Sequence, residues 1–300
     1  MKALKNIENG VRAVLSKHFP VFFTRVLYNH FVGHSLNLDK PEAFTEKIQW
    51  LKLYRYTGNE TVQNCIDKYE VRKYVSSHGC GELLNDLIGV WECVDDIDWE
   101  SLPEKFVLKC NHGCAYNIIC TDKKHFDIEL AKRKLNKWMH EEYGLKYAET
   151  VYFGIKPRII CEKYIETSDG HDLRDYKIFC CYGEPKLVYV ITGGHGKDEC
   201  LDYYTINWEW ISVNNGTLPN AGNSVEKPKK LDEMLGYARK LSSEFPIVRV
   251  DLYCEQEKII FGELTFLPTA GFSHYEPAKY DYEFGKMFDI SKELIASQRQ

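Results

Sequence analysis

Residues 248–272 read VRVDLYCEQEKIIFGELTFLPTAGF, and this stretch decides the fold that the sequence predicts. Two runs, Ile247–Tyr253 and Lys258–Phe266, alternate apolar and polar side chains with the period of two that is typical of strands. A short polar turn separates them. We therefore expect an antiparallel hairpin.

Each predicted strand carries one acidic residue, Asp251 in the first and Glu263 in the second. On neighbouring strands two carboxylates can face the same side of a sheet. Like charges held together need a counter-charge or a shared proton, and a Mg²⁺ ion that bridges phosphates is a suitable counter-charge. Arg249, two positions before Asp251, points to the same face. The alternative is a half-buried hairpin with its charges on the solvent side, and the hairpin alone leaves both interpretations open.

The composition indicates a soluble globular protein. The 300 residues are 44% hydrophobic and 28% charged, enough for one large domain or two to three small ones. A net charge of −5 gives no reason to expect a nucleic-acid partner. The 11 cysteines are scattered without a CxxC pair, which predicts buried reduced thiols in a cytosolic protein rather than a zinc site.

Residues 1–57 read as helices, and their start is amphipathic rather than a secretory signal. Residues 20–32 are rich in aromatic side chains but too short to span a bilayer. A helix docked on the protein's own core is the favoured interpretation, and a helix lying on a membrane surface is the alternative.

The middle of the chain carries candidate phosphate-binding groups. Lys109 ends a compact strand and is followed by the loop Asn111–Asn117, an arrangement in which an ammonium and loop amides can hold phosphate. The alternative is a plain turn between two strands. Lys68 and Arg72 lie four apart on a predicted helix, a pattern more often exposed than functional.

Further strands follow. Arg158–Ile165 contains Glu162, which can accept a hydrogen bond from an amino group or a ribose hydroxyl. Asp175–Tyr182 places Asp175 and Lys177 on one face, because they are two residues apart. The loop 193–197, rich in glycine, has the composition of a segment that closes over a ligand.

Taken together, these segments resemble the TupA-like ATP-grasp family of bacterial surface-polysaccharide biosynthesis. The matching stretches run from about Pro41 to Phe284 and read FTEKIQWLKL, DKYEVRKYV, LPEKFVLKCNHG, KPRIICEKYIE, RDYKIFCCYGEPK, FPIVRVDLY and FGELTFLPTAGF. The resemblance implies an α+β, ATP-grasp fold, in which two α+β subdomains sandwich ATP. We expect a helical N-terminal region at 1–60, a preceding segment at 61–104, a small subdomain at 105–166 and a large subdomain with the hairpin at 167–300.

The resemblance also implies roles for single residues. Those expected to contact ATP are Lys109, Asn111, His112, Gly113, Glu162, Lys163, Tyr164, Ile165 and Lys177. Those expected to hold Mg²⁺ are Asp251, Glu263 and Thr265. Arg249 and Lys177 resemble the cations that steady the acyl phosphate, and His112, His195 or Asp175 would serve as a base. The second metal strand reads Glu263-Leu264-Thr265, where such ligases usually have Glu-x-Asn.

The activity implied is an ATP-dependent carboxylate–amine ligase acting through an acyl phosphate in capsule, O-antigen or teichuronic-type polymer synthesis. Two alternatives remain, a sugar kinase of the same fold and a scaffold without catalysis. The partners expected are carboxylate and amine substrates, either small or linked to a glycan. The location expected is the cytoplasm, with peripheral association with membrane-bound polysaccharide machinery as an option. Residues expected to line an acceptor site are Arg158, Arg174, Asp175, His195, Tyr203 and Trp208.

Overall fold

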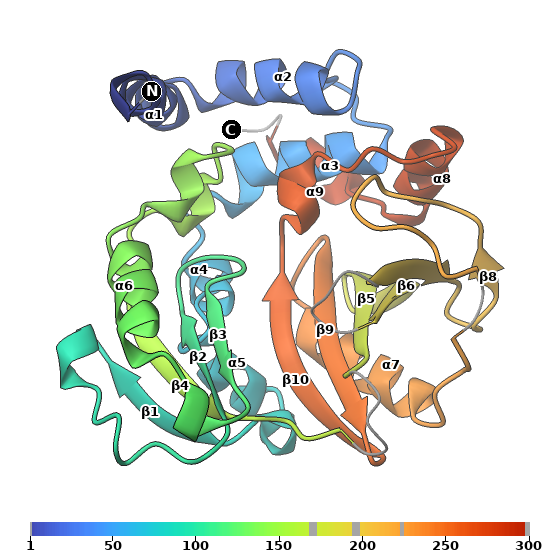
Figure 1. Cartoon of the computed structure of the whole chain (residues 1–300). Coiled ribbons are helices and arrows are strands. Elements are labelled where there is room, and N and C mark those ends of the chain that lie inside the picture. The colour runs from blue at the N-terminus through green and yellow to red at the C-terminus, as the bar shows by residue number, and fades with distance from the viewer. Residues whose placement is uncertain (1, 168–172, 194–198, 223–224, 298–300) are drawn as a thin grey trace.

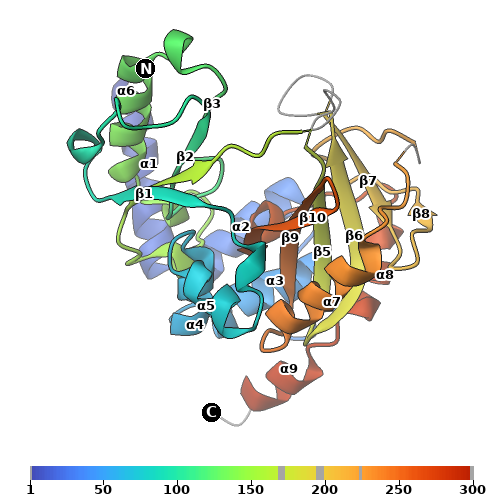
Figure 2. The same ribbon diagram turned by 90° about the horizontal axis from the view of Figure 1, so that it is seen from below.

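Two antiparallel sheets lie side by side in the computed structural model, each with helices against it (Figure 1). The structure describes residues 2–167, 173–193, 199–222 and 225–297. Viewed from below, the two sheets again lie beside one another (Figure 2). The arrangement is α+β because the strands come in runs that pair antiparallel, with helices before, between and after these runs.

The first sheet has the strand order β1-β4-β2-β3. Its strands are β1 (Leu87–Trp91), β2 (Phe106–Cys110), β3 (Asn117–Cys120) and β4 (Ile159–Lys163). Helix α6 (Ile128–Met139) packs on it, and buried Leu108 and Leu135 belong to one small core. Strand β1 lies in the segment predicted as 61–104, yet it pairs with β4.

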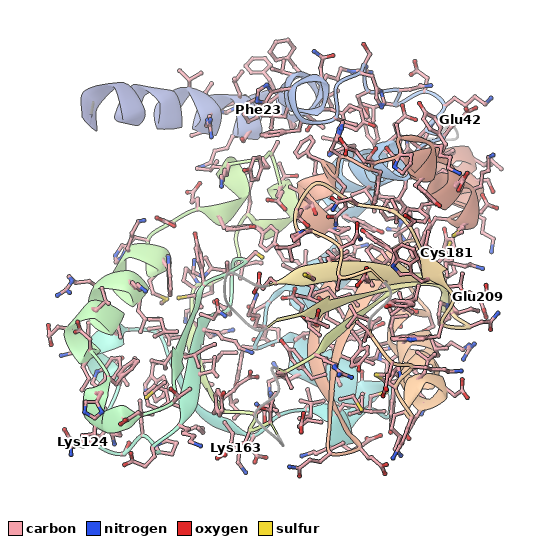
Figure 3. The ribbon with its side chains drawn as sticks, turned by 45° about the vertical axis from the view of Figure 1, so that its right-hand side comes forward. Phe23, Glu42, Lys124, Lys163, Cys181 and Glu209 are labelled. Carbon is pink, nitrogen blue, oxygen red and sulfur yellow. The ribbon has the colours of Figure 1, made fainter. Side chains whose placement is uncertain are left out.

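The second sheet has the order β10-β9-β5-β6-β7-β8. Its strands are β5 (Asp175–Cys181), β6 (Glu184–Thr192), β7 (Cys200–Tyr204), β8 (Trp210–Ile211), β9 (Val248–Glu255) and β10 (Lys258–Thr265). Helix α7 (Leu231–Ser242) packs its apolar face against β5, β6 and β9. The predicted hairpin is confirmed as β9 and β10. Figure 3 shows Lys163 on the side of the first sheet and Cys181 and Glu209 on the other lobe.

The remaining helices pack on the larger core, which belongs to the second sheet, except α1, which contacts α2 and the turn at 143–145. They are α1 (Lys2–His18), α2 (Pro20–Phe31), α3 (Phe44–Leu51), α4 (Glu60–Ile66), α5 (Val71–Ser77), α8 (Lys279–Met287) and α9 (Ser291–Ser297), with a π-helical turn at Lys52–Tyr56. Short 3₁₀ turns occupy 81–83, 94–96, 123–125, 143–145, 150–152 and 268–271. Helices α8 and α9 are separate, and the Asp289 carboxylate accepts a hydrogen bond from Ser291 N at 2.9 Å where α9 begins.

Helix α2 confirms the docked interpretation on one face only. Phe23, Thr24 and Tyr28 are buried, and the Tyr28 hydroxyl lies 2.7 Å from Thr45 Oγ1. On the other face Phe19 and Phe22 are 57% and 60% exposed, so contact with a membrane surface stays a prediction. Within the described ranges, every helix is too short or too polar to cross a bilayer.

Candidate active site

A β-bulge in strand β10 decides where the hairpin carboxylates lie. Phe261 pairs with Leu252, but Glu263 pairs with Asp251, so Gly262 is the extra residue. A regular register would have placed Gly262 opposite Asp251. A Cβ atom on Gly262 would lie 3.0 Å from the backbone oxygen of Asp251, so glycine allows the two strands to approach. The bulge therefore brings the two acids face to face.

Charged side chains from three strands form a network around Asp251, which is 1% exposed. Arg249 donates two hydrogen bonds to it, from Nε to Oδ1 at 2.7 Å and from Nη2 to Oδ2 at 2.6 Å. Lys177 Nζ lies 2.6 Å from Asp251 Oδ2 and 2.6 Å from Asp175 Oδ2. Burial opposes the charge on Lys177, but the two aspartates outweigh it and raise its pKa. Lys177 is therefore a fixed cation.

Glu263 stands at the more open edge of this network. Its Oε1 accepts a hydrogen bond from Thr265 Oγ1 at 3.0 Å, and Oε2 lies 3.7 Å from Lys68 Nζ. Burial acts to raise the pKa of Glu263, but Lys68, Lys177 and Arg249 prevail and lower it to about 2. The carboxylate is thus ionised at any pH where the protein works.

The fit of Mg²⁺ differs between the two acids. The counter-charge next to Asp251 is supplied by Arg249 and Lys177, so its oxygens are already engaged. Glu263 is partly exposed and suits a hard cation that also binds phosphate oxygens. No group of three or more His, Cys, Asp or Glu side chains in the described part of the chain is placed to hold a metal alone. Glu263 would therefore share Mg²⁺ with a nucleotide, and the roles of Asp251 and Thr265 as ligands stay predictions.

A pocket of about 400 Å³, here called the cleft, lies between the two sheets. The residues predicted to contact ATP that line the cleft are Lys109, Glu162, Lys163, Tyr164 and Ile165. Asp175, which is predicted as a base or an acceptor residue, lines it as well. Lys109 Nζ lies 2.6 Å from Glu162 Oε2. Asp175 Oδ1 is buried without a hydrogen-bond partner, and burial raises the pKa of this group. An orphaned polar atom facing a pocket is typical of a ligand site.

Lys68 and Arg72, whose pattern in the sequence favoured exposure over function, also reach the site. Lys68 Nζ donates to the backbone oxygen of Gly113 at 2.8 Å and approaches Glu263. Arg72 Nη1 lies 3.4 Å from Glu162 Oε1. The predicted helix shared by the two residues is wrong, because Lys68 lies in the turn between α4 and α5 and only Arg72 lies in α5. Their spacing of four residues therefore carried no signal, and the packing of these segments brings both cations to the site. Together with Lys109, they make the site rich in positive charge.

A second pocket of about 390 Å³, here called the aromatic pocket, adjoins the network. Its charged lining includes Lys68, Arg249 and Glu263. Its aromatic lining consists of Phe31, Tyr143, Tyr147, Tyr152 and Phe272. The hairpin runs past both pockets, since Tyr253 and Phe261 line the cleft whereas Arg249 and Glu263 line the aromatic pocket.

The side chains of Asn111 and His112 point into the protein. Asn111 Nδ2 donates to Asp67 Oδ2 at 2.7 Å, and its Oδ1 accepts from Arg158 N at 2.6 Å. Both ring nitrogens of His112 have protein partners, Asn111 Oδ1 and the Trp138 oxygen, and burial lowers the pKa of the ring. These contacts are structural, so the predicted catalytic and nucleotide roles of the two side chains gain no support.

Most of the predicted acceptor residues lie away from the two pockets. Arg158 Nη1 pairs with Glu70 at 2.9 Å. Arg174 is exposed, and His195 lies outside the described residues. The expectation for Tyr203 is wrong because it is fully buried and accepts a hydrogen bond from Asn215 at 3.1 Å. Trp208 stacks on Tyr204. Asp175 alone lines the cleft.

Several solved structures superpose on part of the chain, each with a TM-score below 0.5. Solved structures that superpose include a D-alanine–D-alanine ligase from Helicobacter pylori (17% identity, 81% of this chain and 66% of that one, TM-score 0.41). Another is the D-alanine–D-alanine ligase of Bacillus anthracis complexed with ATP (13%, 79% and 69%, 0.45). A third is an L-amino acid ligase from Bacillus licheniformis (16%, 83% and 55%, 0.46). These similarities are too weak to bear on activity, and the chain spans only about half to two thirds of those enzymes.

At the level of sequence, no curated protein matches the chain. A family model does match, over residues 46–289, and its description is TupA-like ATP-grasp. The match covers most of the chain and includes every strand of both sheets. It confirms the predicted α+β, ATP-grasp fold. The protein is a member of the TupA-like ATP-grasp family.

Proposed function

We propose that this protein is an ATP-dependent ligase that activates a carboxylate as an acyl phosphate and joins it to an amine. The observation that carries the proposal is that one hairpin lines both pockets, the cleft through Tyr253 and Phe261 and the aromatic pocket through Arg249 and Glu263. A phosphoryl group held over the network would thus lie between a nucleotide and a second substrate. Such an arrangement suits transfer from one pocket to the other.

The charges of the site match the demands of that reaction. Transfer of a phosphoryl group to a carboxylate brings two anions together, so catalysis depends on neutralisation and alignment. Lys68, Lys109 and Lys177 lie along the path, and buried ion pairs hold Lys177 and Arg249 in place. Preorganised cations of this kind cost no rearrangement when the reaction occurs.

Mg²⁺ would be held by Glu263 and the phosphates, where it would neutralise charge on the transferred group. In the cleft, Lys109 would bind a phosphate, and the backbone of Lys163, Tyr164 and Ile165 would face the adenine. Glu162 orients Lys109 through their 2.6 Å contact. The family resemblance alone extends the proposal to sugar acids or amino acids of bacterial surface polysaccharides as substrates. It also extends the proposal to a cytoplasmic location at the periphery of membrane-bound machinery.

Hydroxylamine provides a direct test, because it attacks an acyl phosphate to give a hydroxamate. The protein would be incubated with ATP, Mg²⁺ and hydroxylamine against a panel of uronic acids and amino acids. We expect hydroxamate together with equal amounts of ADP and phosphate for at least one carboxylate. Phosphate that stays attached to a sugar hydroxyl would instead identify a kinase and overturn the proposal, as would the lack of ATP turnover with every carboxylate tested.

A further inference from the structure

The aromatic pocket contains a carboxylate that the proposed reaction has not used. Glu149 is 2% exposed and lines this pocket. Its Oε2 atom is buried without any hydrogen-bond partner. A buried carboxylate oxygen left in this way costs free energy, and such groups in native proteins usually await a ligand or water. The position therefore indicates a site for a hydrogen-bond donor.

Hydrogen bonds fix the backbone at Glu149. Glu149 N donates to the Gly144 oxygen at 2.9 Å, and its own oxygen accepts from Tyr152 N at 3.0 Å. The preceding residue, Ala148, is fully buried with φ of 52°. A left-handed conformation is unfavourable for alanine, and strain of this kind gathers at functional sites. The backbone at Glu149 is thus held in one conformation beside the aromatic pocket.

Lys52 acts on this carboxylate through its charge but makes no ion pair with it. Lys52 is fully buried, its Nζ donates to the Tyr147 oxygen at 3.2 Å and lies 5.0 Å from the centre of the Phe272 ring, and no ion pair within 4.0 Å joins it to Glu149 among the described residues. Burial has the largest effect on the pKa of Glu149 and raises it, and the charge of Lys52 opposes this effect without cancelling it. Burial also lowers the pKa of Lys52. The Glu149 carboxylate would therefore attract an incoming cation, and the neighbouring Lys52 readily gives up its proton.

Aromatic rings complete the surroundings of Glu149. The rings of Tyr143 and Tyr152 lie 4.8 Å apart, and the ring of Tyr147 lies 6.1 Å from that of Phe272. Aromatic faces attract ammonium groups, and the attraction grows when water is excluded. Tyrosines beside a buried carboxylate suit a cationic amine better than they suit an anion.

From this geometry we propose that the aromatic pocket binds the amine substrate, with its ammonium group between Glu149 and the tyrosine rings. The proposal rests on the ligase function, and it adds which pocket receives the nucleophile. An amine seated there would lie in the same pocket as Arg249 and Glu263, next to the transferred phosphoryl group. Glu149 is assigned a binding role, in which its carboxylate holds the ammonium group of the amine in the pocket.

Binding of a simple amine tests the site without relying on catalysis. Saturation-transfer NMR would compare n-propylammonium with its uncharged counterpart 1-propanol on the full chain. We expect n-propylammonium to bind at least tenfold more tightly than 1-propanol, and Glu149→Gln to remove this preference. The control Glu142→Gln should keep it, since Glu142 is exposed in the same segment and pairs with Lys17 at 2.6 Å. Equal binding of both probes by the wild type, or an unchanged preference in Glu149→Gln, would overturn the proposal.

A kinetic measurement separates this site from the ligase function as a whole. In amide formation, Glu149→Gln should raise KM for the amine at least tenfold while KM for ATP changes less than twofold. Tyr147→Leu should act in the same direction and provides a second variant if the first is unstable. A proportional fall in kcat with both KM values unchanged would contradict amine binding. Failure of hydroxamate formation by the wild type would contradict the ligase, and the NMR comparison would still decide the amine site.

Discussion

Glu263 lies opposite Asp251 because Gly262 bulges out of strand β10. The pairing places an ionised carboxylate at the open edge of a network whose centre is closed by Lys177 and Arg249. The two acids thus have separate tasks. Asp251 holds Lys177 and Arg249 in place, and Glu263 lines the aromatic pocket.

The bulge itself can be tested by Gly262→Ala. The added Cβ would crowd the backbone oxygen of Asp251 at 3.0 Å, so we expect a loss of about 1 kcal/mol in the free energy of unfolding. Misplacement of Glu263 should lower ATP turnover about tenfold. The matched control is Gly236→Ala in helix α7, where nothing lies within 4 Å and alanine should stabilise the protein. Urea denaturation and an ADP-release assay measure both effects, and equal behaviour of the two variants would count against the bulge.

Glu263→Gln tests the charge at the edge of the network. Loss of an ionised group that contacts the transferred phosphate or its metal should reduce ATP turnover at least about 100-fold. The melting temperature should fall as well, because a carboxylate with a lowered pKa stabilises the folded protein at neutral pH. Turnover is therefore compared at a temperature where both proteins are folded. Glu257→Gln, at the exposed turn of the same hairpin, should retain turnover. Normal ATP consumption by Glu263→Gln would refute its predicted role.

Lys109→Ala tests the nucleotide cleft. Removal of an ammonium that contacts phosphate should weaken ATP binding about tenfold or more, and calorimetry with a non-hydrolysable ATP analogue would measure it. The control is Lys163→Ala: the role expected of Lys163 belongs to its backbone, and its side chain is 66% exposed. That variant should bind the analogue within about twofold of the wild type. Equal losses in the two variants would remove Lys109 from the phosphate site.

The burial of Glu149 makes stability depend on pH. Burial raises its pKa to about 7 from an ordinary value of 4.5, so the folded protein holds this proton more tightly than the unfolded chain. Its contribution to stability is therefore fully present below about pH 4.5 and is lost as the pH rises through about 7, by up to about 3 kcal/mol.

Glu149→Gln removes the carboxyl group, and with it the loss of stability that this group causes as the pH rises. We expect the variant to exceed the wild type in free energy of unfolding at pH 8 but not at pH 4.5, as measured by urea denaturation at each pH. Lys52 has a lowered pKa and acts in the opposite sense, with a contribution lost as the pH falls, so each pH requires its own wild-type reference. A constant difference between the two proteins across this range would contradict a raised pKa.

The sequence predicts the strands of the hairpin well because period-two alternation is a local property. It does not predict the pairing of Asp251 with Glu263, since a one-residue bulge is a property of two strands together. The contrast continues at the helices. The amphipathic runs of α6 and α7 are visible in the sequence, but the break before α9 depends on a single capping side chain, Asp289.

The site follows the same rule. Lys109, Glu162 and Asp175 could be proposed from strand ends and from the family resemblance, and they line one cleft. Lys68 and Glu149 come from segments whose local pattern carries no chemical signal. Only the packing of α4, of the turns at 143–152 and of the hairpin brings them together. For Glu149 the available hint was an acidic residue in the tyrosine-rich run EEYGLKYAETVYF (141–153).

A crystal structure with Mg²⁺ and a non-hydrolysable ATP analogue would show whether Glu263 and the nucleotide meet. We expect adenine against Lys163–Ile165, phosphate oxygens within hydrogen-bonding distance of Lys109 and Lys177, and Mg²⁺ bound by Glu263 together with the phosphates. A nucleotide bound outside the cleft, or a triphosphate that points away from Glu263, would contradict this expectation.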